Sequence, residues 1–316
     1  MTSATARRAD VASASAAFGV GLLSALQSRM NGGLAEAWTD PIAAATFSFA
    51  TGLIALTVMV VIVPSVRSGA LGIMRALRAS TLRWWELAGG LCGGVFVVTQ
   101  SAVVPVVGVA AFTVGVVAGQ TANSLVVDRL GLGPQGTIHI TRFRMLSAAM
   151  AVVAVAIAVA GRGGADLPSV LPLLAALGAG VLVAFQQAFN GRVTREGGNA
   201  LSATWVNFLL GTTLLVVLLA ASHGADMADH VTFEVEPWLL LGGVVGLAFI
   251  ALAAWSVPRI GVLLTALLAV AGNLTSSFVL DVVLPTSGTV VNAALVVGIM
   301  MAFAAVFVGA RGRSVR

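Results

Sequence analysis

Charged side chains are scarce in this sequence. Only 9% of the 316 residues are charged, whereas 59% are hydrophobic. Ordinary soluble domains carry about a quarter of their residues as charged side chains. A water-soluble fold is therefore excluded, because it would have to hide more apolar surface than a core can hold.

Lysine is absent, and there is one cysteine, Cys92. Without lysine the chain has no P-loop, so it does not hydrolyse nucleotides through one. A single cysteine forms neither an internal disulfide nor a thiolate metal site. Histidine is expected only in loops, at His139, His223 and His230, and no serine, histidine and carboxylate lie credibly together. We expect no cofactor, no bound metal and no enzyme activity.

The apolar residues come in blocks of roughly 20, the length that crosses about 30 Å of hydrocarbon as a helix. The blocks lack the alternation of barrel strands. They predict an all-α integral membrane protein with ten transmembrane helices, with 64–83 and 222–237 as loops. The predicted helices cover 11–30, 41–63, 85–104, 106–127, 142–160, 168–189, 200–221, 238–257, 261–280 and 290–309.

The 17 arginines report the orientation of the chain. If the N-terminus is cytoplasmic, only Arg29 and Arg162 fall outside, and the acidic 222–237 loop faces out. Positive residues concentrate on the cytoplasmic side of membrane proteins. We therefore expect both termini in the cytoplasm. The inside set is Arg7, Arg8, Arg67, Arg75, Arg78, Arg83, Arg129, Arg142, Arg144, Arg192, Arg195, Arg259, Arg311, Arg313 and Arg316.

The chain contains an internal duplication. Residues 16–52 align with 175–211 at an offset of 159, and residues 85–128 align with 238–281 at an offset of 153. The second alignment holds sixteen identities in 44 positions, including paired Trp, Pro and Asp. Chance matching of Val, Leu and Ala does not explain those identities. The sequence predicts two repeats, 11–160 and 168–310, within one transmembrane domain.

Five helices in each repeat force the second copy to enter the membrane from the opposite side. Such inverted repeats exchange conformations around a midplane site, which gives alternating access. The architecture therefore favours a secondary transporter. The alternative is a non-transporting membrane scaffold or interaction protein, since a fold alone does not prove a function.

Several motifs occur in both halves: Gln-x-x-x-Asn-Gly at 27–32 and 186–191, Phe-x-x-Gly at 49–52 and 208–211, and Pro-x-x-Gly at 105–108 and 258–261. With these motifs the chain resembles the drug/metabolite transporter superfamily, and within it the YdcZ-like branch of inner-membrane exporters. The resemblance covers nearly the whole chain. It implies a carrier of the bacterial cytoplasmic (inner) membrane. Its central cavity would be walled by the first four helices of each half, with the fifth helices at the periphery.

Amide side chains inside the apolar blocks are the candidate substrate ligands, because an amide in lipid must find hydrogen-bond partners. They either bind solute or join helices, and both readings stay open. Asn31 and Asn190 each precede a glycine, so we favour a helix-stop role for them. Gln120 and Asn273 are the best central candidates. The full set is Gln27, Asn31, Gln120, Gln186, Gln187, Asn190, Trp205, Asn207 and Asn273.

Three carboxylates are candidates for coupling or gating. Glu86 follows Trp84 and Trp85 at the predicted inner surface, where Arg83 is near enough to pair with it. Asp128 and Asp281 occupy equivalent positions at helix ends, where water is near. Ordinary structural roles are the alternative for all three.

The predicted cavity carries amides and hydroxyls and no fixed charge. A small organic solute that is neutral or zwitterionic suits such a cavity, because an uncompensated charge is costly at low dielectric constant. The expected partners are membrane lipid and this solute, and a homodimer stays an open alternative. Nucleic acid is not expected despite the net charge of +5, because the arginines are scattered through loops and tails.

Overall fold

The computed structural model describes residues 3–161, 167–224, 234–260 and 262–311. Its side-chain description further leaves out 3–11, 167–169, 254, 257–259 and 262–264. Within the described part the chain forms helices and no strand. The α-helices are α1 Ser3–Trp38, α2 Pro41–Ile62, α3 Pro64–Arg78, α4 Gly89–Val107, α5 Val109–Arg129, α6 Arg142–Ala160, α7 Leu167–Gly197, α8 Ala200–His223, α9 Gly242–Ile260, α10 Val262–Val283 and α11 Ala293–Arg311.

Two short 3-10 helices, η1 at Trp84–Ala88 and η3 at Pro237–Leu241, lead into α4 and α9. Several residues singled out in the sequence lie outside the described side chains. They are Arg7, Arg8, Arg162, His230, Pro258, Arg259, Arg313 and Arg316.

Eight of the described helical segments are long and apolar enough to cross a membrane. They cover α2, η1 with α4, α5, α6, α7, α8, most of α10, and α11. A shorter apolar stretch runs from Pro237 to Ala253. The all-helical membrane fold is therefore confirmed, whereas the described residues contain eleven α-helices instead of the ten predicted.

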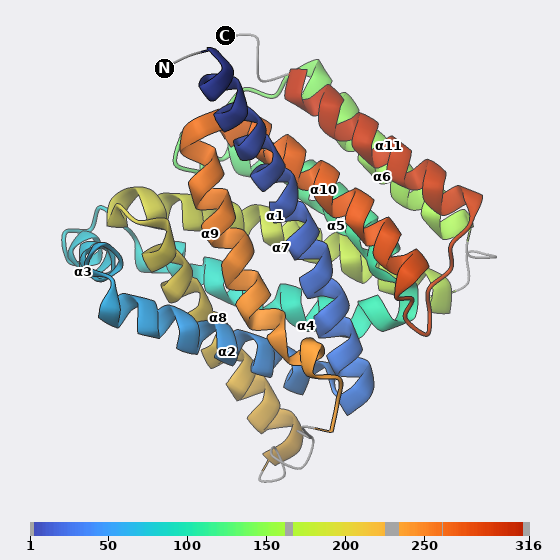
Figure 1. The fold of residues 1–316 in the computed structure, drawn as a ribbon, viewed down its shortest axis with the longest axis horizontal. Coiled ribbons are helices and arrows are strands. Elements are labelled where there is room, and N and C mark those ends of the chain that lie inside the picture. Colours follow the sequence, from blue (N-terminus) through green and yellow to red (C-terminus); the bar gives the residue numbers. More distant parts are fainter. Residues whose placement is uncertain (1–2, 162–166, 225–233, 261, 312–316) are drawn as a thin grey trace.

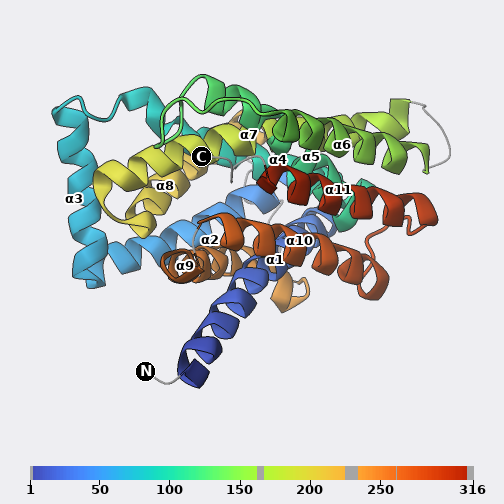
Figure 2. The same cartoon turned by 90° about the horizontal axis from the view of Figure 1, so that it is seen from above.

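The additional helix is α3, which corrects the prediction of a loop at 64–83. Pro64 stands in its first turn, where a missing amide hydrogen costs little. Its buried residues, Val66, Gly69, Ile73 and Ala76, recur every three or four positions. The arginines occupy the rest of the surface, so α3 is amphipathic and lies beside the bundle (Figure 2). A search for apolar blocks of 20 passes over such a helix.

The two Asn-Gly pairs do not stop helices, which corrects a second prediction. Asn31 lies inside α1, which continues to Trp38, and Asn190 lies inside α7, which continues to Gly197. The glycine after Asn31 serves close packing: a side chain at Gly32 would meet Val104 of α4 at 2.6 Å. An Asn-Gly pair therefore marks a helix contact here and not a turn.

The sequence predicted helices over 85–104 and 106–127, with the break between them at Pro105. The break between α4 and α5 instead falls at Gly108. Pro105 belongs to the last turns of α4. Gly108 has a φ of +85°, a backbone conformation that favours glycine. The hydrogen-bond ladder of α4 runs past the proline, because Gly108 N still donates to the Val104 carbonyl at 2.9 Å, and the glycine makes the turn.

Helices from the two halves cross at glycines, and the crossings correspond. Gly21 of α1 contacts the backbone of α10 at Ala269, and Gly180 of α7 contacts the backbone of α5 at Val116. Gly21 aligns with Gly180 at the offset of 159. Glycine lets backbones approach closely in membranes, so each crossing depends on it. Figure 1 shows α1 alongside α10, and α7 alongside α5.

The remaining helices surround these crossings. Phe49 of α2 stacks on Phe208 of α8, with ring centroids 4.7 Å apart. The helices α6 and α11 pack on each other at one edge of the bundle (Figures 1 and 2). This placement agrees with the peripheral position that the family resemblance implies for the fifth helices.

The glycine crossing predicts a sharp difference between two neighbouring substitutions. Gly180→Ala should lower stability by about 1–3 kcal/mol, because the new methyl group meets the Val116 carbonyl oxygen. Gly178→Ala is the matched control: no atom lies within 4 Å of its new methyl group. It should gain about 0.5–1 kcal/mol, because alanine is the better helix former. Thermal unfolding in detergent measures both, and equal melting temperatures would contradict the crossing.

Candidate functional site

The helix connections gather at two opposite ends of the bundle. At one end, which we call the acidic end, Arg29 Nε donates to the Leu284 carbonyl at 2.7 Å, and Gly288 N donates to the Pro105 carbonyl at 2.8 Å. At the other, the arginine end, Arg195 bonds the Pro134 carbonyl. The described arginines of this end are Arg67, Arg75, Arg78, Arg83, Arg129, Arg142, Arg144, Arg192, Arg195 and Arg311.

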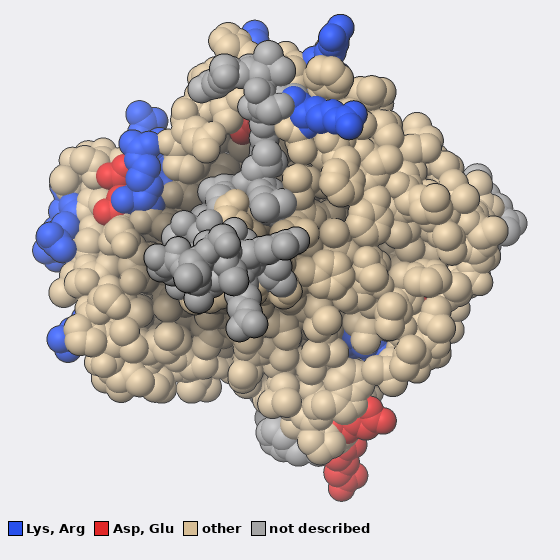
Figure 3. Space-filling model, turned by 45° about the horizontal axis from the view of Figure 1, so that its top comes forward, with Lys and Arg blue, Asp and Glu red and all other residues tan. Residues whose placement is uncertain are grey.

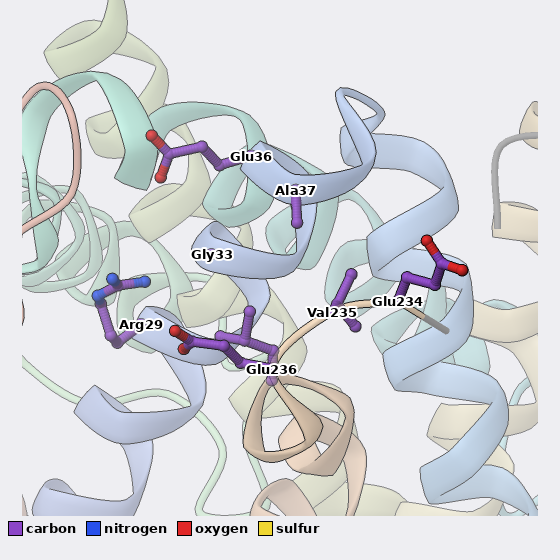
Figure 4. Close-up of a pocket in the computed structure, with 8 residues that line it drawn as sticks. Arg29, Gly33, Glu36, Ala37, Glu234, Val235 and Glu236 are labelled. Atoms are coloured by element: carbon purple, nitrogen blue, oxygen red, sulfur yellow. The ribbon is translucent and has the colours of Figure 1, made fainter. Parts of the chain in front are cut away.

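The surface separates charges in the same way. Figure 3 shows arginine side chains along the left and upper parts of the molecule, with some acidic side chains among those on the left. A separate group of acidic side chains lies at the lower edge. A pocket at the acidic end is lined by Arg29, Glu36, Glu234 and Glu236 (Figure 4). Arg29 also lies over the ring of Trp238, 5.6 Å from its centroid. Arg29 therefore ties α1 to the segments around this pocket.

A buried chain of hydrogen bonds joins α1 to α4 toward the acidic end. Asn31 Nδ2 donates to Gln100 Oε1 at 2.8 Å, and Gln100 Nε2 donates to Ser28 Oγ at 2.7 Å. Each of the three side chains is at most 4% exposed. Gln27 adds a bond from Nε2 to the Gly242 carbonyl of α9, at 3.1 Å. In this state, these amides join helices.

A second amide cluster lies toward the arginine end. Gln186 Nε2 donates to Asn207 Oδ1 at 3.2 Å, and Asn207 Nδ2 donates to Asn190 Oδ1 at 3.0 Å. Gly89 and Gly93 of the η1–α4 segment leave room for these side chains. The equivalent residues Gln186, Asn190 and Gln27, Asn31 therefore both make interhelical bonds, but with different partners.

The sequence paired Gln120 with Asn273, and the described contacts place them at different crossings. Gln120 Nε2 donates to Gln187 Oε1 at 3.0 Å, where α5 meets α7, and Gln187 is exposed. Asn273 Oδ1 accepts from Ser277 within α10, at 3.3 Å. Trp205 Nε1 donates to Thr57 Oγ1 at 3.1 Å, between α8 and α2. Of these amides, Gln187 is exposed, whereas Gln120 and Asn273 are partly exposed.

Glu86 is buried, with 2% of its surface exposed, and its partner differs from the one predicted. Its carboxylate forms an ion pair with Arg192 of α7. Arg83 contributes only its backbone N–H, which donates to Glu86 Oε2 at 2.7 Å. The Arg83 guanidinium lies over Trp85 instead, 5.9 Å from the ring centroid. Sequence proximity favoured Arg83, but the fold brings in a residue more than a hundred positions away.

Asp128 and Asp281 end their helices as predicted, yet Asp281 is not near water. It is 2% exposed, and its two oxygens accept the N–H groups of Val109 and Ala110, both at 2.8 Å. Asp128 instead pairs with Arg144 of α6. The sequence predicts that a helix ends at Asp281, but it does not show that the first turn of α5 lies against that end.

His223 also departs from the solvated loop position predicted for it. It is the last residue of α8, and its Nε2 lies 3.2 Å from Asp40 Oδ2. Within the described residues, no three His, Cys, Asp or Glu side chains lie close enough to hold a metal ion.

Gln100 is the main residue missing from the set of candidates predicted from the sequence. The search favoured polar residues present in both repeats, and the equivalent of Gln100 is Ala253. Its position in the middle of an apolar block was the available signal, because a buried amide must find partners. Arg144 and Arg192 escaped notice for a different reason, since they were counted only for orientation.

The comparison with protein families decides what kind of protein this is. A family model described as "Putative inner membrane exporter, YdcZ" matches residues 13–157 and again residues 171–308. The chain belongs to the YdcZ family. With its apolar helices, this YdcZ-family chain is a multi-pass inner membrane protein.

Comparisons with individual proteins add little. One solved structure, described as "Crystal structure of protein", is 19% identical to this YdcZ-family chain and has a TM-score of 0.47. The match covers 95% of this chain and 99% of that one. At this similarity it carries no functional argument. None of the curated proteins compared matches the chain.

The buried amide chain generates a stability prediction. Gln100→Ala should cost about 1–3 kcal/mol, because Asn31 and Ser28 lose their common partner in a buried site. Thr99→Ala is the control, since the exposed Thr99 hydroxyl only bonds its own helix at the Val95 carbonyl. Thermal unfolding in detergent compares the two. An equal loss of stability in both variants would show that the hydrogen bonds of Gln100 add nothing to the stability of the protein.

Proposed function

We propose that the chain is a secondary transporter that exports a small organic solute across the inner membrane by alternating access. The observation that carries this proposal is a contrast. The two halves make equivalent helix crossings at Gly21 and Gly180, yet their polar contacts differ between the two ends of the bundle. Equivalent halves held in unequal contacts are what one state of an alternating-access cycle requires.

The proposal includes ten membrane-crossing helices in two inverted repeats, 11–160 and 168–310. In it α1 and α9 cross the membrane along with the eight apolar segments, whereas α3 lies at the surface. The family model supports this division because it matches one stretch in each half. The equivalent glycine crossings support it independently.

The solute site belongs, in this proposal, to the amides at the crossings. Gln120 and Gln187 are the first candidates, because they are partly or fully exposed and so have bonding capacity to offer. Asn273 lies at the corresponding crossing of α1 and α10. Gln27, Asn31 and Gln100 are buried and engaged in helix contacts, so they would meet solute only in another state. Amides without a fixed charge suit a neutral or zwitterionic solute.

A transport assay tests this site. Cells producing Gln120→Ala/Gln187→Ala should release less of the exported solute than cells producing equal amounts of the intact protein. Thr213→Ala is the matched control, because its exposed hydroxyl bonds only its own helix. The readout compares solutes released into the medium by mass spectrometry. If neither intact nor variant protein changes any solute, and no solute raises the melting temperature, the chain is a scaffold.

The orientation has a separate test. The excess of arginine predicts that the arginine end is cytoplasmic and that both termini lie there. In a Cys92→Ser background, Glu234→Cys should react with an impermeant maleimide added to whole cells. Ser68→Cys, exposed on α3, should react only after the membrane is opened. The reverse pattern would overturn the orientation and leave the fold untouched.

A further inference from the structure

The helices α5 and α10 come from different halves and run antiparallel. Toward the acidic end they are joined by hydrogen bonds: Asp281 accepts from Val109 and Ala110, and Thr113 Oγ1 lies 2.9 Å from Ser277 Oγ. All of these residues are nearly or fully buried. The two helices are therefore clamped together at this end.

The Asp281 contact is strong for a physical reason. The first N–H groups of a helix lack partners inside the helix and carry a partial positive charge. A buried carboxylate that accepts two of them forms charge-assisted hydrogen bonds. Gly108 makes room, because a side chain there would meet Asp281 Oδ2 at 2.8 Å. Asp281 of one half thus caps a helix of the other half.

Toward the arginine end, the polar residues of α5 bond to helices other than α10. Gln120 reaches Gln187 of α7, and Asn123 Nδ2 donates to the Val181 carbonyl, also of α7, at 3.0 Å. Asp128 pairs with Arg144 of α6. Among the described contacts, the clamp between α5 and α10 therefore lies at the acidic end. The arginine end of α5 bonds to α6 and α7.

The duplication makes this difference informative. Asp128 is the repeat equivalent of Asp281, and the start of α10 is the equivalent of the start of α5. Because the helices are antiparallel, Asp128 and the start of α10 belong to the same end of the pair. The chain thus carries the residue for a second cap there, but Arg144 holds that carboxylate instead. Arg144 has no charged counterpart, since α11, the last helix of the second half, carries no charged residue before Arg311.

We propose that Asp281 and Asp128 are the two positions of one switch. Asp281 clamps α5 to α10 at the acidic end in the state described here, and Asp128 makes the same cap on α10 at the arginine end in the opposite state. Arg144 holds Asp128 out of use until then. This inference rests on the proposed alternating access, and it names the residues that set the equilibrium between its two states.

Cysteine reactivity in lipid nanodiscs tests the switch, because an impermeant maleimide reaches both faces there. All variants carry Cys92→Ser. Val104→Cys reports on the acidic end, since Val104 is fully buried and packs on Gly32. Ser124→Cys reports on the arginine-end half of α5 and is partly exposed. The reaction rate of each reporter measures how often its end is open.

Asp281→Asn should raise the rate at Val104→Cys by about tenfold and lower the rate at Ser124→Cys, because one state loses its charge-assisted cap. Arg144→Gln should shift both rates in the same directions, since it frees Asp128 to cap α10. Adding Asp128→Asn to Arg144→Gln should reverse that shift. Asn199→Ala is the control, because Asn199 caps α8 from within its own half.

The outcomes separate this switch from alternating access itself. Opposite changes at the two reporters, with reversal in the double variant and none in Asn199→Ala, support the switch. If both reporters react in the parent protein but the Asp281 and Arg144 variants leave the rates unchanged, the switch is wrong and alternating access stands. If Val104→Cys never reacts in any folded variant, both proposals fail. The Arg144 series decides the matter even if Asp281→Asn does not fold.

Discussion

The crossing of helix backbones at glycine is the constraint on which the rest of this structure depends. At Gly21 and Gly180 the neighbouring helix approaches so closely that any side chain would collide with its backbone. Lipid offers no hydrophobic drive to hold helices together, so association depends on close packing and interhelical hydrogen bonds. The two crossings fix α1 on α10 and α7 on α5, and the described polar contacts between the halves are arranged around them.

Polar groups on this frame break its symmetry. Asn31 bonds across to Gln100 of α4, whereas its equivalent Asn190 bonds to Asn207 of α8. Asp281 caps a helix of the other half, whereas Asp128 pairs with an arginine. A buried amide or carboxylate must be satisfied in every populated state, because leaving it unpaired costs more than one hydrogen bond is worth. In the proposed transport cycle, a duplicated set of such groups would give the two states different sets of contacts.

The sequence predicted the parts of the fold that apolar length and repetition determine. Blocks of 20 apolar residues identified the membrane helices. The internal alignment predicted that the two halves have equivalent residues, and Gly21 and Gly180 are such a pair. The predictions from sequence failed where contacts between residues far apart in the chain determine the structure. The Asn-Gly pair at Asn31 has the composition of a helix stop, and only the approach of α4 explains why α1 continues. Likewise, the pairing of Glu86 with Arg192 requires η1 to lie against α7, which no local pattern states.

The distribution of charge also constrains how solute movement would be coupled to a driving force. The middle of the bundle carries amides and hydroxyls, whereas the carboxylates Glu86, Asp128 and Asp281 lie toward its ends. An isolated charge in the middle of a membrane protein is costly without a partner, so a neutral centre keeps both states accessible. In the proposed cycle, groups near the ends would meet water in one state and protein in the other. Any ion that drives the cycle would therefore act at the helix ends, apart from the amides that meet the solute.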